Sequence, residues 1–91
     1  MHRVQDTATR AYQALLAAQP TTAAKVGFAW QIAAGPALGR AGVPHWSEDG
    51  TLRVATRDSA WQREIRRARS IIKTRLDVLL GAGTVQRLEI D

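Results

Sequence analysis

Residues 43–56, Val-Pro-His-Trp-Ser-Glu-Asp-Gly-Thr-Leu-Arg-Val-Ala-Thr, decide the fold of this chain. Residues that favour strands lie on both sides of Asp49-Gly50, a dipeptide typical of the tight turn of a β-hairpin. We therefore expect one strand over residues 43–47 and a second, antiparallel strand over residues 51–56.

The second strand of this hairpin has the two-residue period of a half-buried strand. Leu52 and Val54 share one face. Arg53, Ala55 and Arg57 share the other. One face of the sheet is therefore expected to be buried and the other to meet solvent.

A long helix is expected directly after the hairpin, with Asp58 or Ser59 as its cap and Gly81 at its end. Its apolar residues recur at steps of three and four, which is the spacing of a single helix face. We expect this apolar stripe to pack in the core: Trp61, Ile65, Ala68, Ile72, Leu76 and Leu79.

Two helices are expected before the hairpin, over residues 7–18 and 23–34. Gly35-Pro36 should bend or interrupt the second, and a further turn would reach Arg40. Apolar residues on opposite sides of this second helix predict that it is covered on two sides, as a central packing element.

A last strand is expected over residues 84–90, with Leu88 and Ile90 pointing inward and Arg87 outward. The order is then ααββαβ, and the economical architecture is α+β, with helices packed on one face of a three-stranded sheet. Ninety-one residues without repeats or linkers fit one domain over residues 1–91.

The composition excludes several classes of protein. Hydrophobic residues make up 45% and charged residues 23%, which is ordinary for a globular chain and unlike a disordered or fibrous one. Without cysteine there is no disulfide framework and no thiolate metal site, which points to a reducing compartment, with the cytoplasm as the default. No apolar run approaches the length of a membrane span, and no membrane partner is expected.

Positive charge is concentrated in one part of the chain. The net charge is +5, but residues 53–75 alone carry +6 and the remainder carries −1. Eleven of the thirteen basic residues are arginine, whose planar guanidinium suits phosphate and carboxylate groups. The pattern favours a localised contact with a polyanion over a diffuse solubilising coat.

Two basic surfaces are expected from this stretch. On the long helix, basic residues on the arc opposite the apolar stripe favour contact with phosphates, with a merely solvated helix face as the alternative: Arg63, Arg66, Arg67, Arg69 and Lys73. On the exposed face of the sheet, a second patch would comprise Arg53, Arg57 and Arg87.

Aromatic residues and one glycine motif offer further candidates. Trp61 lies on the apolar stripe, so core packing is favoured, with contact to a base or a protein partner as the alternative. Trp46, beside the hairpin turn with His45, could provide a stacking platform for a single-stranded base, against the alternative of packing on the sheet. Residues 39–42 fit the G-x-x-G of nucleic-acid-binding KH domains, but they lead from a helix into a strand, where a helix end is the better interpretation.

Catalytic motifs are absent from the sequence. It contains no G-x-S-x-G, no H-E-x-x-H and no Walker-type phosphate loop, and its only imidazoles are those of His2 and His45. We therefore expect no enzyme, no cofactor, no metal site and no small-molecule substrate.

Three motifs in register resemble the DciA family of bacterial replicative-helicase loaders, over about residues 26–90. Trp30 is followed by Gly35-Pro-Ala-Leu38 and then Pro44, similar to the family's W-x4-G-x2-[IL] helix and the proline before its hairpin. Residues 49–54, Asp-Gly-Thr-Leu-Arg-Val, resemble its D-G-x-L-x-V strand. Residues 59–65, with Ser, Trp, Glu and Ile in the matching places, resemble its S-x-W-x2-E-[LI] helix start.

The resemblance implies a small globular domain with a KH-like fold, which binds the DnaB-type replicative helicase and single-stranded or forked DNA in the cytoplasm, associated with the nucleoid. Typical family members also carry a long basic or disordered extension, which these 91 residues do not include. Two alternatives remain open at this point: a protein-interaction module without DNA affinity, with Trp61 as a partner contact, and a KH-like RNA-binding domain.

Overall fold

Four helices and a three-stranded sheet make up the fold, and the computed structural model describes residues 4–91. In chain order the elements are α1 (Val4–Ala17), α2 (Ala23–Ala41), β1 (Gly42–Ser47), β2 (Thr51–Thr56), α3 (Ser59–Arg67), α4 (Arg69–Leu80) and β3 (Arg87–Ile90). The predicted α+β fold and the ααββαβ order are confirmed, with the third predicted helix divided at Ala68.

The sheet has the strand order β1-β2-β3, with β1 antiparallel and β3 parallel to β2. The expected hairpin turn forms at Asp49-Gly50, where the Gly50 N–H donates to the Ser47 carbonyl at 3.0 Å and Gly50 adopts φ +95°. That positive φ is readily adopted only by glycine. The Gly50 carbonyl then accepts from the Gln86 N–H at 2.7 Å, which joins the hairpin turn to the start of β3.

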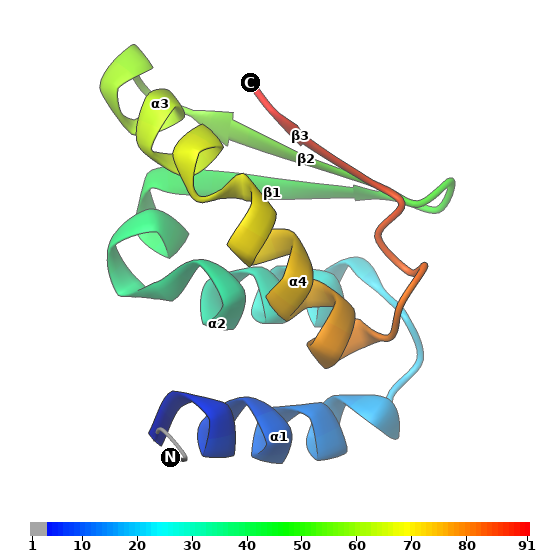
Figure 1. The fold of residues 1–91 in the computed structure, drawn as a ribbon. Coiled ribbons are helices and arrows are strands. Elements are labelled where there is room, and N and C mark those ends of the chain that lie inside the picture. Colours follow the sequence, from blue (N-terminus) through cyan, green and yellow to red (C-terminus); the bar gives the residue numbers. More distant parts are fainter. Residues whose placement is uncertain (1–3) are drawn as a thin grey trace.

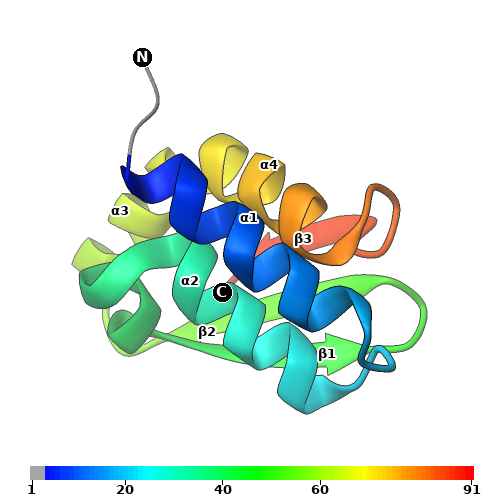
Figure 2. The same cartoon turned by 90° about the horizontal axis from the view of Figure 1, so that it is seen from below.

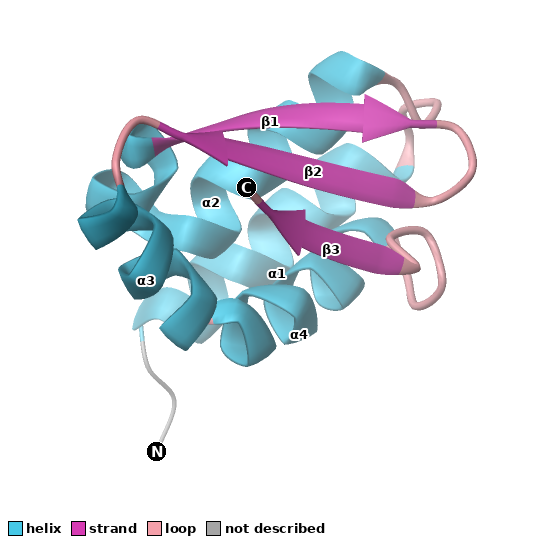
Figure 3. Cartoon of the chain, turned by 90° about the horizontal axis from the view of Figure 1, so that it is seen from above, coloured by secondary structure: helices cyan, strands magenta, loops and turns pink. Residues whose placement is uncertain are grey.

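The helices α1, α2 and α4 lie on one side of the sheet, and α3 lies at its end, beside β2 and β3 (Figure 1). The helices α2 and α4 form the layer next to it, and α1 lies beyond them, packed on α4 (Figure 2). The opposite face of the sheet is uncovered (Figure 3). Inward-pointing side chains of β2 and β3 meet the helices in a core whose members include Trp30, Leu52, Val54, Ile65 and Leu88, all at most 2% exposed.

A kink in α2 decides where its last turns lie. The helix starts at the cap Thr22, whose side chain accepts from the Lys25 N–H at 3.2 Å. Gly35 adopts φ +87° before Pro36, which has no N–H to continue the helix, so the expected bend is confirmed. The last turns, 36–41, then run directly into β1 through Gly42.

Gly42 allows α2 and β1 to join without a linker. A methyl group at this position would lie 2.5 Å from Cγ1 of Val54 and 3.0 Å from Cζ2 of Trp30. Only a residue without a side chain fits this close approach of backbone to core. Residues 39–42 are therefore a helix end leading into a strand, as expected, rather than a loop between two helices.

Several element boundaries differ from the predicted ones. The first helix begins at Val4 rather than at residue 7. The single helix expected up to Gly81 is two, because the backbone at Ala68 (φ −89°, ψ 1°) leaves helical geometry and changes the direction of the chain (Figure 1). The last strand begins at Arg87 rather than at residue 84. Residues 84–86, which were predicted to belong to this strand, form a loop instead. A hydrogen bond of 2.9 Å from the Thr84 hydroxyl to the Leu80 carbonyl holds this loop.

The prediction that α2 is covered on two sides holds at Ile32, which packs against the core, and is wrong at Phe28. Phe28 is 48% exposed, and its ring forms a T-shaped pair with Tyr12 from α1, with ring centroids 5.7 Å apart. The reason is that α1 packs mainly on α4, so it covers only part of α2.

None of the helices in residues 4–91 combines the length and hydropathy needed to span a membrane.

Candidate nucleic-acid interface

The helix α3 carries two of the predicted phosphate contacts on its exposed surface. Asp58 caps the helix, its carboxylate accepting from the Trp61 N–H at 2.9 Å. Arg63 is exposed and has no ion pair or hydrogen bond to any described residue. The Arg67 side chain is 77% exposed and only loosely paired with Glu64 at 3.6 Å, one helical turn back. Both guanidinium groups are accessible to a ligand.

Two further predicted contacts, Arg66 and Arg69, bind the edge of the sheet instead. Nη2 of Arg66 donates to the Ile90 carbonyl at 3.2 Å, and Nε of Arg69 donates to the Leu88 carbonyl at 2.9 Å. β3 has a neighbouring strand on one side only, so alternate carbonyls along its other side need a partner. The two arginines supply it, and we call this pair the β3 latch.

The basic residues of α4 are also engaged within the molecule. Nζ of Lys73 lies 2.8 Å from the Asp77 carboxylate, one turn further along the helix. Nη1 of Arg75 donates at 3.1 Å to the carbonyl of Ala33, which lies just before the kink of α2. The expectation of one continuous basic face on a long helix is therefore wrong, because the helix is broken and these cations have local partners.

The exposed sheet face holds arginines whose charge is balanced. Nη2 of Arg53 lies 3.0 Å from Glu89 on the neighbouring strand, and its Nε lies 3.7 Å from Asp91. The hydrogen bond and the charge of Glu89 raise the pKa of Arg53 above its already high usual value. Arg87 pairs with Asp49 at 3.5 Å and donates to the Thr51 hydroxyl at 3.2 Å. This predicted patch is therefore largely neutralised.

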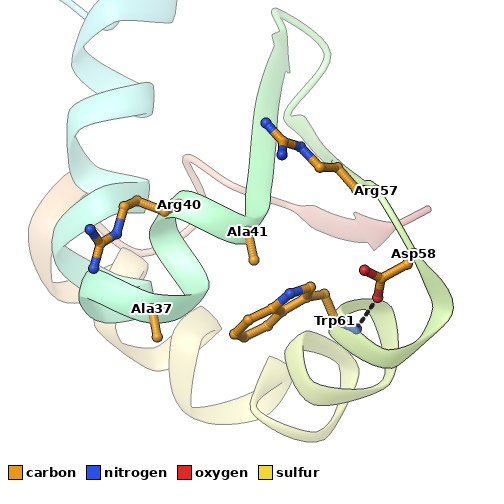
Figure 4. Close-up of a pocket in the computed structure, with 6 residues that line it drawn as sticks. All are labelled: Ala37, Arg40, Ala41, Arg57, Asp58 and Trp61. Carbon is orange, nitrogen blue, oxygen red and sulfur yellow. Dashed lines mark hydrogen bonds between the residues drawn. The ribbon is translucent and has the colours of Figure 1, made fainter.

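Arg57 does not belong to the sheet patch in which the sequence places it. β2 ends at Thr56, and Arg57 lines a cleft of about 530 Å³ with Arg40, Trp61 and three smaller residues, Ala37, Ala41 and Asp58. The cleft lies between the last turns of α2 and the first turn of α3 (Figure 4). It is open on the side of solvent, and two cationic side chains border it.

Trp61 is 39% exposed in this cleft, so the expectation that it packs in the core is wrong. It lies in the first turn of α3, where only the short side chains of Ala37 and Ala41 face its ring from α2 (Figure 4). The rest of the apolar stripe packs inward, and Ile65, one turn later, is fully buried. The stripe predicted the core correctly except at its end.

Trp46 packs on the sheet, which the sequence analysis gives as the alternative to a stacking platform. Its register opposite Leu52 places it on the helix side of the sheet, where it is half-buried against the hydrophobic core. Its neighbour His45 points to the uncovered side, opposite Arg53. The geometry places Trp46 in sheet packing rather than on an exposed stacking platform.

Arg40 is a candidate that the sequence analysis did not single out. Its Nε donates to the Pro36 carbonyl at 3.1 Å, and its two Nη groups have no hydrogen bond to any described residue. The sequence feature that could have identified Arg40 is its position after Gly35-Pro36, because a bend there turns the following residues away from the axis of the first half of the helix.

Among the described residues, no group of three or more His, Asp or Glu side chains could hold a metal ion.

Comparison with known proteins agrees with the three motifs. None of the curated proteins compared with the chain matches it. The family model described as "Dna[CI] antecedent, DciA" matches residues 3–90, which is nearly the whole chain. This chain therefore belongs to the DciA family, whose role is the loading of the DnaB-type replicative helicase in DNA replication.

Proposed function

We propose that this domain is a non-catalytic accessory of DNA replication, which contacts the DNA backbone and the DnaB-type helicase in the cytoplasm, at the nucleoid. The observation that carries the DNA contact is the set of arginines around α3 without a strong internal partner: Arg57, Arg63 and Arg67. Each can neutralise a phosphate and release counterions, which supplies affinity independent of base sequence.

The remaining predicted contacts have a secondary part in this proposal. Arg53, Arg66, Arg69, Lys73 and Arg87 each use donor atoms on an internal acceptor. A guanidinium carries five N–H donors, so an arginine held by one or two of them can still approach a phosphate. Their contribution is long-range attraction, whereas the arginines around α3 make the direct contacts.

The test is anisotropy of a labelled forked DNA, titrated with the protein from about 50 to 200 mM salt. We expect Arg57→Gln/Arg63→Gln to lower the affinity and to reduce the slope of log K against log salt by about 0.7 to 0.9 for each lost contact. The matched control is Arg53→Gln/Arg87→Gln, which removes the same charge from arginines that are already paired. Equal losses in both variants would contradict the site and leave only an effect of net charge.

Absence of DNA binding at the lowest salt concentration would contradict the DNA contact itself. Retention of the assembled helicase ring on the immobilised domain would then favour a protein-interaction module, with the exposed Trp61 as its contact. Tighter binding to RNA than to DNA of the same sequence would favour a KH-like RNA-binding domain.

A further inference from the structure

The cleft beside Trp61 presents an aromatic surface in a site with room for a planar ligand. The indole is 39% exposed, and the residues that face it from α2 are Ala37 and Ala41, whose side chains are short (Figure 4). The volume of about 530 Å³ lies within the range of small-ligand sites, roughly 300 to 1,000 Å³. A flat ring system can therefore stack on the indole without displacing the helices.

Two cationic residues from different elements line the same cleft. Arg40 belongs to the last turns of α2, and Arg57 belongs to the segment between β2 and α3 (Figure 4). Arg40 is oriented by its Nε bond to the Pro36 carbonyl, and Arg57 has no ion pair or hydrogen bond to any described residue. The one acid of the lining, Asp58, caps α3 by accepting from the Trp61 N–H. Both guanidinium groups point away from the indole (Figure 4), so they are available to anions at the rim of the cleft rather than directly beside the ring.

An unpaired nucleotide has this combination of groups. Each base of a single strand offers a planar π-face to an aromatic side chain, and a phosphate lies on each side of its sugar. In a duplex the same faces are covered by the neighbouring base pairs. Resting on the proposed DNA contact, we propose that the cleft holds one unpaired nucleotide of single-stranded DNA, its base on Trp61 and its adjoining phosphates directed to the rim, where Arg40 and Arg57 lie.

The test compares a labelled oligothymidine with a duplex of the same length, using the full chain. We expect Trp61→Ala to weaken oligothymidine binding by roughly 5- to 100-fold, the loss typical of one stacked base, and to change duplex affinity less than about twofold. Trp61→Phe retains a ring and should restore most of the single-strand affinity. Circular dichroism of each variant checks that the fold is kept, and Trp61→Leu, which keeps apolar bulk but has no ring to stack, replaces Trp61→Ala if that variant fails to fold.

Arg40 provides the second arm of the test. Arg40→Gln should reduce the salt slope for oligothymidine by about 0.7, the value for one contact with a single strand. The matched control is Arg75→Gln, which removes the same charge from a guanidinium that binds the Ala33 carbonyl away from the cleft. We expect the control to leave the slope for oligothymidine unchanged.

The outcomes separate this inference from the proposed function. If the wild-type protein binds both DNAs with steep salt dependence but Trp61→Ala weakens neither or both equally, the nucleotide site is overturned and the DNA contact stands. If the wild-type protein binds neither DNA, both proposals fall. If Trp61→Ala abolishes retention of the helicase and leaves oligothymidine binding intact, the ring is a protein contact and the nucleotide site is overturned.

Discussion

The β3 latch and the cleft place the same residue type in opposite situations. Arg66 and Arg69 each donate to a carbonyl on the edge of β3. Arg57 and Arg40 border an open cleft at the start of α3, and neither forms an ion pair with a described residue. Arg57, Arg66 and Arg69 come from one basic stretch, so the density of charge in the sequence does not separate them.

What separates the two regions is whether a carbonyl of another element lies within reach, because Arg40 binds only the Pro36 carbonyl of its own helix and Arg57 binds none among the described residues. An edge strand exposes carbonyls along its whole open side, and an arginine on a helix packed beside it can bind them. The cleft lies instead where the kinked end of α2 meets the cap of α3, and its one carboxylate is occupied by the cap. Arginine therefore stabilises the fold in the first region and remains available for a ligand in the second.

The largest expected effect tests the junction of α2 and β1 at Gly42, on which the shape of the cleft depends. Gly42→Ala adds a methyl group 2.5 Å from Cγ1 of Val54, so the end of α2 must move away from the sheet. We expect a loss of about 1 to 3 kcal/mol of unfolding free energy, measured by urea denaturation. Because Arg40 and Ala41 directly precede Gly42, we also expect weaker binding of oligothymidine. A variant as stable as the wild type would show that this joint is not tightly packed.

Removal of an arginine of the β3 latch should lower the stability of the fold without changing DNA binding in the cleft. Arg69→Ala leaves the Leu88 carbonyl without its donor, and we expect a loss of about 1 kcal/mol, or about 4 to 8 °C in Tm for a domain of this size. Arg63→Ala is the matched control, and its change should stay within about 0.5 kcal/mol because the side chain is exposed and unpaired among the described residues. Equal thermal shifts in the two variants would break the distinction between latched and available arginines.

The fold could be predicted from the sequence where a helix or strand pattern ended at residues that specify a turn, a bend or a helix cap. The hairpin depends on Asp49-Gly50, the bend on Gly35-Pro36 and the start of α3 on its cap, and all three are decided by neighbouring residues. The break at Ala68 carries no such signal, because no glycine or proline marks it. It lies between Arg66 and Arg69, the two residues that reach β3.

The candidate site was harder to predict because its charges are balanced by distant residues. Arg53 is paired with Glu89, and 36 positions separate them, so only the parallel register of β2 and β3 brings them together. Lys73 and Asp77, one turn apart on a helix, were the exception that spacing alone could have found. The exposure of Trp61 depends on where α2 turns after its kink, which no local pattern specifies.

A third prediction converts a paired arginine into an available one. Glu89→Gln removes the main counter-charge of Arg53 on the uncovered sheet face while keeping the shape of the side chain. We expect forked DNA to bind about two- to threefold more tightly at low salt, with a steeper salt slope, because the arginine can then neutralise a phosphate. Glu64→Gln is the control at the loosely paired Arg67, and it should change the slope less. No change in either variant would mean that pairing does not limit these arginines.

The smallest expected effect concerns the pairing of Arg87 as the pH falls. Hydrogen bonds from the side chain and backbone of Thr51 hold the pKa of Asp49 below its usual value, and the charges of Arg87 and Arg53 act in the same direction. A carboxylate whose pKa is lower in the folded state stabilises the fold above its unfolded pKa of about 3.8, and this contribution disappears as the pH falls through the folded value.

We therefore expect the Tm difference between the wild-type protein and Asp49→Asn to be small, constant above about pH 5 and progressively lost below about pH 4. The exposure of Asp49 to solvent keeps the effect small, because water screens both its hydrogen bonds and its pairing with Arg87. Parallel Tm curves from pH 6 to pH 2 would show that the carboxylate does not hold the turn. Arg87 would then have to be counted with the available arginines rather than with the paired ones.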